Sequence, residues 1–400
     1  MNLSDVFPAV AHKTLVAVDL PHAGSNQHEL NGVAALREFF RTTRKTEGTI
    51  NWHYFADDRD PEHGTGKFTF YDARAKSAHR TGRSEWRLYY SGDFLLRARP
   101  GDLLVLARTA SGAYHALVFQ KDSSWLRAAR ELLGLTELQR RFRWIPSERL
   151  ERHSLEFFRQ RILDELELGL GLPASSDDEA LVVERFGHAF PSTREMSALA
   201  RSLAEADLRD PDATLTRWLH REEQLFRALE TVIVRERLQQ QFRSVDEFIE
   251  YSLSVHNRRK SRMGFALQNH LEELFRLSGL RFSTQVRTER NNTADFIFPG
   301  AREYRDPAFD TALLVMLGAK STCKDRWRQV LTEAARIPTK HLCTLEAGIS
   351  TKQTDEMRAH SLRLVIPAGL HCTFTRRQRA WIMTVGGFID FVRHKQRKLL

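Results

Sequence analysis

The sequence has few cysteines and no long apolar run. Its only cysteines, Cys323, Cys343 and Cys372, lie far apart and form no C-x-x-C pair. This spacing supports neither a disulfide framework nor a zinc site, and it fits a reducing cytoplasm. No stretch of roughly eighteen apolar residues occurs, and residues 1–12 lack the basic and apolar segments of a secretory signal. We therefore expect neither a membrane span nor a leader.

The composition is that of a folded, basic protein. Apolar residues make up 42% of the 400 positions and charged residues 28%, as in ordinary globular chains. This length is enough for two domains with sizeable cores. The formal net charge of +10 and the isoelectric point near 9.7 favour a polyanionic partner, and nucleic acid is the first candidate.

Two short apolar runs, one opened by an acid and one closed by a lysine, organise the carboxy-terminal half. Asp295 stands near the start of residues 293–299 (TADFIFP), directly before the apolar FIF run, and Lys320 follows residues 313–319 (LLVMLGA). Both runs are bulky and bounded by turn residues, which is typical of buried strands. If the two strands are neighbours in a sheet, Asp295 and Lys320 meet at one edge of it.

A carboxylate beside a lysine suits metal-assisted phosphodiester hydrolysis. The carboxylate holds a divalent ion, the ion polarises a phosphoryl oxygen, and the lysine orients or deprotonates the attacking water. Nucleases of this type usually carry a second acid two residues before the lysine, but Gly318 stands there. Glu333 could replace it from a helix predicted over 325–336. On spacing alone, turn and surface roles for Asp295 and Lys320 are the commoner interpretation.

Four sequence blocks resemble the EcoRII-type restriction endonucleases. They are residues 242–249 (FRSVDEFI), 257–262 (NRRKSR), 320–329 (KSTCKDRWRQ) and 362–367 (LRLVIP). The resemblance implies an α/β domain of the restriction-endonuclease fold, with a central mixed sheet flanked by helices. It also implies a magnesium-dependent enzyme that cuts both DNA strands at a short CC/GG-based site. By match of position, the catalytic residues would be Asp295, Lys320 and Glu333, with Asp295 and Glu333 as ligands of Mg²⁺.

The same resemblance implies which side chains contact DNA in this domain. Base recognition falls on Lys324, Asp325 and Arg326. Lysine and arginine pair with guanine O6 and N7, and aspartate accepts from cytosine N4, although a charged first helical turn would also explain the triplet. Further contacts are expected from Arg259, Arg262, Arg217, Arg221 and Trp218. For Trp218 a position in the core is the commoner alternative.

The amino-terminal part is rich in short strand-like runs. They are Thr14–Leu20, Thr49–Phe55, Lys67–Tyr71, Trp86–Tyr90, Leu103–Ala107 and Tyr114–Phe119. Such runs predict a barrel or sandwich. The basic loop between Tyr71 and Arg87 resembles the effector domain of the same family, a DNA-binding pseudobarrel similar to a plant transcription-factor module. The DNA contacts that this resemblance implies are His28, Asn31, Arg80, Arg83, Trp86 and Arg87. A solvated basic surface, with Trp86 in the core, is the alternative.

Residues 169–179 are rich in glycine, proline, serine and acids, which is typical of a linker. We therefore expect an all-β or α+β effector domain over residues 1–145. A helical segment and linker would follow over 146–180, and a catalytic domain over 181–400.

The predicted function is that of a type II restriction endonuclease acting on double-stranded DNA in the bacterial cytoplasm. We expect a monomer or a homodimer, with a cognate DNA methyltransferase as a genetic partner. One alternative is a modification-dependent endonuclease whose amino-terminal domain reads a modified base. Another is a sequence-specific DNA-binding regulator with a degenerate nuclease domain. The sequence leaves open the recognition site, base flipping, and inhibition of the nuclease by the effector domain.

Overall fold

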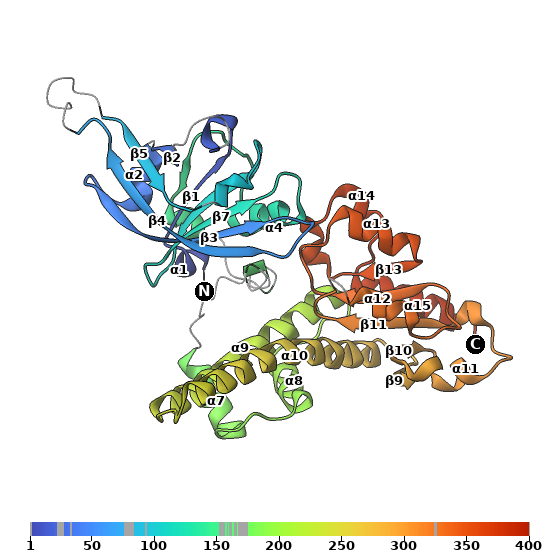
Figure 1. The fold of residues 1–400 in the computed structure, drawn as a ribbon. Helices are drawn as coiled ribbons and strands as arrows, with labels where there is room; N and C mark the ends of the chain where they lie inside the picture. The colour runs from blue at the N-terminus through green and yellow to red at the C-terminus, as the bar shows by residue number, and fades with distance from the viewer. Residues whose placement is uncertain are drawn as a thin grey trace. The chain divides into compact units, whose positions relative to one another are not determined.

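The computed structural model describes residues 2–21, 28–32, 34–75, 84–92, 94–151, 157, 159, 162–163, 166, 175–323 and 326–399. The chain divides into two compact units, Met1–Leu170 and Gly171–Leu400 (Figure 1). The finer division of the chain at residues 145 and 180 stays a prediction. None of the helices in the described ranges is long and apolar enough to cross a membrane.

One eight-stranded sheet forms the amino-terminal unit, in the order β2-β5-β4-β3-β7-β6-β1-β8. The strands are β1 (Ala9–Thr14), β2 (Glu29–Gly32), β3 (Thr46–Phe55), β4 (Glu62–Asp72), β5 (Trp86–Tyr90), β6 (Leu103–Arg108), β7 (Tyr114–Phe119) and β8 (Arg143–Ile145). Strands β3 and β7 run parallel, and the other neighbouring pairs run antiparallel. The five runs predicted between residues 49 and 119 are therefore strands.

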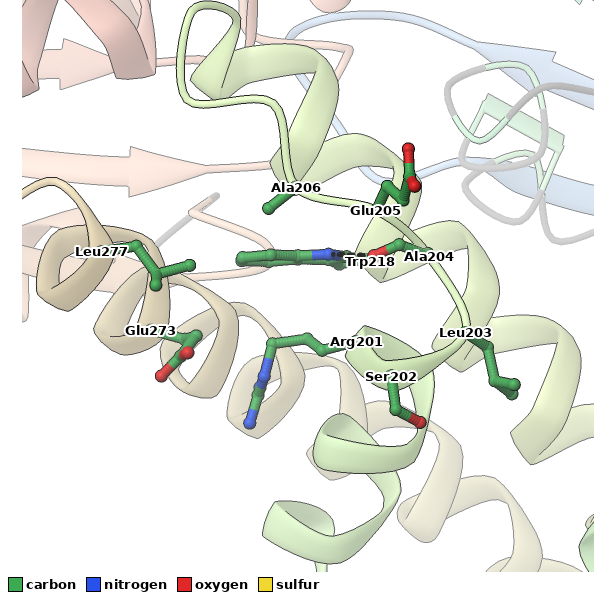
Figure 2. Close-up of a pocket in the computed structure, with 9 residues that line it drawn as sticks. All are labelled: Arg201, Ser202, Leu203, Ala204, Glu205, Ala206, Trp218, Glu273 and Leu277. Atoms are coloured by element: carbon green, nitrogen blue, oxygen red, sulfur yellow. Dashed lines mark hydrogen bonds between the residues drawn. The ribbon is translucent and has the colours of Figure 1, made fainter.

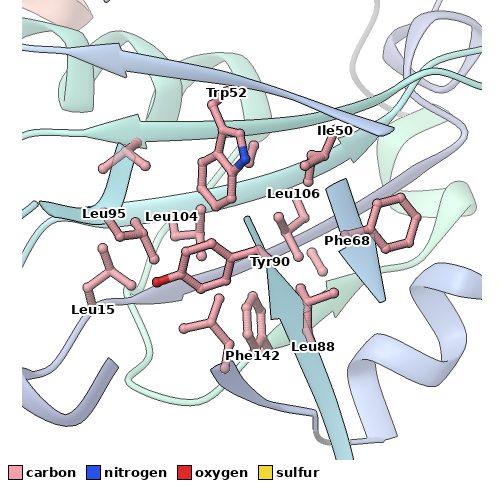
Figure 3. Close-up of a cluster of buried hydrophobic side chains, with 14 of the residues drawn as sticks. Leu15, Ile50, Trp52, Phe68, Leu88, Tyr90, Leu95, Leu104, Leu106 and Phe142 are labelled. Atoms are coloured by element: carbon pink, nitrogen blue, oxygen red, sulfur yellow. The ribbon is translucent and has the colours of Figure 1, made fainter. Parts of the chain in front are cut away.

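Helix α2 (Ala34–Phe40) lies against both ends of this sheet. It packs on β2 at one end and on β1 and β8 at the other. The sheet therefore wraps around one apolar core, which includes Trp52, Phe68 and Tyr90 (Figure 3). The other helices of this unit in the described ranges are α1 (Leu3–Val6), α4 (Ser124–Leu133) and α5 (Ser147–Glu151). A DNA-binding pseudobarrel stays a prediction for this unit.

The strand predicted over Thr14–Leu20 was wrong. Strand β1 ends at Thr14, and residues 17–19 form a single helical turn. Asp19 causes the turn, because its carboxylate accepts from Val16 N at 2.8 Å and from Lys13 Nζ at 2.6 Å. Both charged side chains are buried, so the pair replaces the apolar strand contacts expected from the local pattern.

The carboxy-terminal unit begins with four helices. They are α7 (Ser176–Phe186), α8 (Thr193–Ser202), α9 (Pro211–Gln239) and α10 (Val245–Leu277). Helix α9 starts with Pro211 after Asp210, whose side chain accepts from Ala213 N at 3.0 Å, as expected of an N-cap. The long helices α9 and α10 pack side by side (Figure 1).

A five-stranded mixed sheet follows, in the order β13-β12-β11-β10-β9. The strands are β9 (Ser283–Arg287), β10 (Thr293–Phe298), β11 (Val315–Lys320), β12 (Lys340–Thr344) and β13 (Leu362–Val365). Strands β9, β10 and β11 pair antiparallel, whereas β11, β12 and β13 pair parallel. The accompanying helices are α11 (Ala301–Arg305), α12 (Trp327–Thr332), α13 (Thr351–Ala359), α14 (Arg376–Arg379) and α15 (Val385–Arg397). The predicted mixed α/β sheet with flanking helices is confirmed.

The helix predicted over 325–336 is shorter than expected. Helix α12 ends at Thr332, and Glu333 is already extended, with φ −76° and ψ 144°. Ala334 follows with a left-handed φ of 49°. Tertiary hydrogen bonds end the helix, since Asn292 Nδ2 donates to Thr332 O at 2.9 Å and Lys340 Nζ donates to Ala334 O at 2.5 Å.

Candidate active site

Asp295 and Lys320 meet across two neighbouring strands. Strands β10 and β11 pair antiparallel, so the beginning of β10 lies beside the end of β11. Lys320 Nζ donates to Asp295 Oδ2 at 2.8 Å, and Ala319 N donates to the same oxygen at 2.8 Å. The predicted meeting of the two side chains is therefore confirmed. Asp295 is buried and Lys320 is half-buried, so the pair lies at the rim of the sheet.

Gly318 explains why the second acid comes from elsewhere. Side chains at 318 and 320 share one face of β11. A Cβ at Gly318 would lie 3.1 Å from Val330 Cγ2 of α12, so the helix occupies the space that an acid would need. Helix α12 then leads directly to Glu333. The glycine thus admits the helix whose end carries Glu333.

Glu333 is a buried carboxylic acid beside this pair. Burial raises its pKa to about 7, and the negative charge of Asp295 adds to the shift, while Lys320 and Lys340 oppose it. Glu333 Oε2 has no hydrogen-bond partner among the described residues. A buried carboxyl oxygen without a donor is ready to accept a cation.

The buried Lys340 and the exposed Glu289 hold the loop that carries Glu333. Lys340 is buried, and its Nζ donates to Ala334 O at 2.5 Å and to Ile337 O at 2.6 Å. Glu289 Oε2 accepts from Ala335 N at 3.0 Å. Neither Lys340 nor Glu289 was predicted from the sequence, because a lysine at a strand start and an acid in a turn look like ordinary surface residues.

The carboxylates fit a hard divalent ion. In the described part of the chain, no cluster of three or more His, Cys, Asp or Glu side chains is placed to hold a metal. Magnesium needs fewer protein ligands, since it keeps several waters and takes one or two carboxylates. Asp295 and the unpartnered oxygen of Glu333 supply oxygens of this kind.

Comparison with known proteins identifies this part of the chain. Residues 226–389 match the family model described as EcoRII C terminal. The curated protein "Type II restriction enzyme EcoRII" of Escherichia coli is 46% identical over 201 residues, which are 50% of this chain and 50% of that protein. The chain thus matches about half the length of this relative. The predicted EcoRII-type resemblance is confirmed over this region.

Solved restriction-endonuclease structures show a weaker likeness. "Metal-depleted Ecl18kI in complex with uncleaved, modified DNA" has a TM-score of 0.45 and 15% identity, over 57% of this chain and 86% of that one. "Restriction endonuclease PspGI-substrate DNA complex" has a TM-score of 0.41 and 14% identity, over 57% and 94%.

The loop predicted to read bases in the EcoRII-like region begins at a buried anchor. Cys323 N donates to Glu346 Oε2 at 2.6 Å, and both residues are buried. Lys324 and Asp325 lie outside the described residues. Arg326 is exposed and precedes α12. Base recognition by these side chains stays a prediction.

Arg259 and Arg262 of α10 are ion-paired with acids of α9. Arg262 is buried, its Nη2 pairs with Glu223, and its guanidinium lies 4.2 Å from the ring centre of Phe226. Arg259 is more exposed, and its Nη2 lies 2.5 Å from Glu230 Oε2. In this arrangement Arg262 offers DNA no exposed guanidinium. The DNA contacts expected of both arginines stay predictions.

Trp218 is buried, in agreement with the core alternative. Its Nε1 donates to Ala204 O at 2.9 Å beside a cavity of about 380 Å³ (Figure 2). Arg217 Nη2 donates to Thr214 Oγ1 at 3.0 Å, and Arg221 forms a two-pronged pair with Asp178. The DNA contacts expected of these three residues stay predictions.

Those predicted effector contacts that the structure describes lie on or next to β2 and β5. Arg80 and Arg83 are outside the described residues, and Asn31 is exposed. His28 contacts Tyr90 edge to face, and Trp86 stacks on Phe70 with ring centres 4.8 Å apart. Arg87 pairs with Glu29 and Glu85 at 2.5 and 2.7 Å. Binding of DNA by these residues stays a prediction.

Proposed function

We propose that this chain is a type II site-specific deoxyribonuclease that hydrolyses double-stranded DNA with Mg²⁺. One observation carries the proposal: Lys320 is hydrogen-bonded to Asp295 next to the buried Glu333. These residues lie in the part of the chain that matches EcoRII. Carboxylates that can hold a divalent ion, with a lysine beside them, suit metal-assisted phosphodiester hydrolysis.

Each of the three side chains would have a separate role. Asp295 and Glu333 would hold the Mg²⁺ ion through carboxylate oxygens. The ion, when bound, polarises a phosphoryl oxygen and acidifies a water. Lys320, held in place by Asp295, would orient the attacking water and help to remove its proton. Cleavage would leave a 5′-phosphate, as the EcoRII resemblance implies.

Specificity would come from the loop after β11. We propose that Lys324, Asp325 and Arg326 read a CC/GG-based site in the major groove. Their chemistry supports this role, because cationic side chains pair with guanine and aspartate accepts from cytosine. Arg259, Arg217 and Arg221 would add contacts to the phosphates, and the net charge of +10 supports such binding.

The amino-terminal unit would bind a second copy of the site as an effector. Asn31 and the basic segment before Trp86 are its candidate contacts. A homodimer would place one carboxy-terminal site on each DNA strand. A methyltransferase encoded beside the enzyme would protect the host DNA, and the enzyme would act in the bacterial cytoplasm.

Digestion of unmethylated plasmid DNA by the purified protein, in Mg²⁺ and in EDTA, tests the proposal. We expect discrete fragments only in Mg²⁺, with sequenced ends at one CC/GG-based site. Cleavage restricted to methylated plasmid would instead indicate a modification-dependent enzyme. A sequence-specific gel shift without cleavage would indicate a DNA-binding regulator. A short duplex carrying the site, added in trans, tests effector binding, since it should accelerate cleavage of a single-site plasmid.

A further inference from the structure

Gln285 lies directly across the sheet from Asp295. Strand β9 pairs with β10 so that Val286 faces Ala294 and Thr284 faces Phe296, which places Gln285 opposite Asp295. Opposite residues of antiparallel strands point to the same side of the sheet. Gln285 Nε2 donates to Asp295 Oδ1 at 3.1 Å.

The backbone of Gln285 has a conformation that is unusual for a strand. Its φ is +50°, in the left-handed region that favours glycine and, among other residues, asparagine. Thr284 and Val286, on either side of Gln285, pair regularly with β10, whereas Gln285 itself does not. Such backbone strain persists where the surroundings enforce it, and it is common at functional sites.

The donors around Asp295 leave little freedom to its carboxylate. Oδ2 accepts from Lys320 Nζ and Ala319 N, and Oδ1 accepts from Gln285. A carboxylate offers about four lone-pair positions, so these three bonds leave one, on Oδ1. Because the amide of Gln285 is neutral, it can orient this oxygen without repelling a cation.

We infer that Gln285 is a positioning residue that holds Asp295 Oδ1 ready for a divalent cation. This inference rests on the proposed function, because it concerns the same metal site. Gln285 is itself exposed, so replacing it leaves the core intact. The left-handed backbone of Gln285 is strained, and it lets the side-chain amide lie opposite Asp295 while β9 continues on both sides.

Mn²⁺ binding to the full chain without DNA tests the inference, with the free ion followed by electron paramagnetic resonance. Q285G and Q285N both accept a left-handed backbone but lose the donor, since glycine has no side chain and asparagine is one methylene shorter. We expect the Mn²⁺ dissociation constant to rise about tenfold in both variants. This is the lower end of the range for loss of a residue that orients a metal ligand. The melting temperature of Q285G in EDTA should equal or exceed that of the wild type, because the strain is relieved.

Ser361→Gly is the matched control. Ser361 has a φ of +56° in the turn before β13, and among the described residues no hydrogen bond or ion pair links it to Asp295, Lys320 or Glu333. S361G should keep the Mn²⁺ affinity of the wild type. An unchanged dissociation constant in Q285G and Q285N would overturn the inference, as would a wild type that binds no Mn²⁺. A wild type that binds Mn²⁺ but cuts no DNA would refute the proposed function and leave the role of Gln285 standing.

Discussion

Lys320 Nζ and Asp295 Oδ2 lie 2.8 Å apart, although the residues are 25 positions apart in the sequence. The antiparallel pairing of β10 and β11 brings them together at the rim of the sheet. Glu333 reaches the same site by another route, at the end of a helix that packs on Gly318. The candidate site is therefore assembled from one strand pair and one helix end.

Lys320→Ala should abolish DNA cleavage while sequence-specific binding persists. The lysine is proposed to act on the attacking water, so its loss removes a group needed for the chemical step. We expect cleavage to fall by at least about 100-fold, as measured by plasmid digestion, with affinity in gel shifts changed by less than about threefold. Lys352→Ala, at an exposed position of α13, is the control and should cut normally. Cleavage by the Lys320 variant would remove this residue from the mechanism.

Glu333→Gln should change how stability depends on pH when no metal is present. The pKa of Glu333 is raised to about 7 in the folded protein, above its usual value. Between about pH 4.5 and 7 the folded state keeps a proton that the unfolded state has lost, so wild-type stability falls as pH rises. Glutamine lacks this titration. In EDTA the unfolding free energy of the variant, relative to that of the wild type, should therefore rise by about 2 kcal/mol from pH 5 to pH 8.

Urea unfolding across this pH range would measure the difference. Glu250→Gln, on the exposed side of α10, is the control and should follow the wild type. Mg²⁺ should flatten the wild-type dependence, because a cation favours the ionised carboxylate. Parallel curves for Glu333→Gln and wild type would contradict the raised pKa.

Asp212→Ala should destabilise the carboxy-terminal unit without disturbing the proposed metal site. Asp212 Oδ1 accepts from Ala368 N and Val385 N, both at 2.9 Å, and Oδ2 accepts from Gly386 N at 2.8 Å. Removing the carboxylate leaves three amides without their partner, which costs about 3 kcal/mol in unfolding free energy. Asp390→Ala, at an exposed side chain, should cost far less. Equal losses of unfolding free energy in the two variants would show that the hydrogen bonds to the Asp212 carboxylate do not stabilise this unit.

Gly318→Ala and Gly264→Ala should have opposite effects on stability. A Cβ at 318 would lie 3.1 Å from Val330 Cγ2, whereas a Cβ at 264 meets nothing within 4 Å. We expect Gly318→Ala to cost about 1 kcal/mol through overpacking. Gly264→Ala, inside α10, should stabilise by up to about 1 kcal/mol. Thermal unfolding of both variants measures the difference in stability. If Gly318→Ala were more stable than the wild type, α12 would shift easily to admit the added methyl group.

Moving the second acid to position 318 should not rescue a Glu333→Gln enzyme. Any side chain at 318 must displace Val330, and with it the helix that leads to the site. The double variant Gly318→Asp with Glu333→Gln should therefore be as inactive as Glu333→Gln alone in plasmid digestion. Restored cleavage would show that the strand position is still usable.

Much of the fold followed from local pattern. The apolar runs at β10 and β11 were recognisable because short bulky segments bounded by turn residues are typical of buried strands. Their pairing made the meeting of Asp295 with Lys320 predictable. Runs rich in aromatic and β-forming residues likewise predicted five strands of the amino-terminal unit. The Thr14–Leu20 prediction failed because the buried Lys13–Asp19 pair overrides local preference.

The sequence by itself determined the two apolar runs that form β10 and β11, the acid and the lysine at their ends, and the likeness to EcoRII. Only the tertiary structure decided that the end of α12 brings Glu333 to Asp295 and Lys320. It also decided that Gln285 has a left-handed backbone and that Arg262 is buried against Glu223. The physical reason is the distance along the chain over which each signal acts. Strand and helix signals depend on neighbours along the chain, whereas a helix end, a left-handed residue or a buried arginine depends on partners from distant segments.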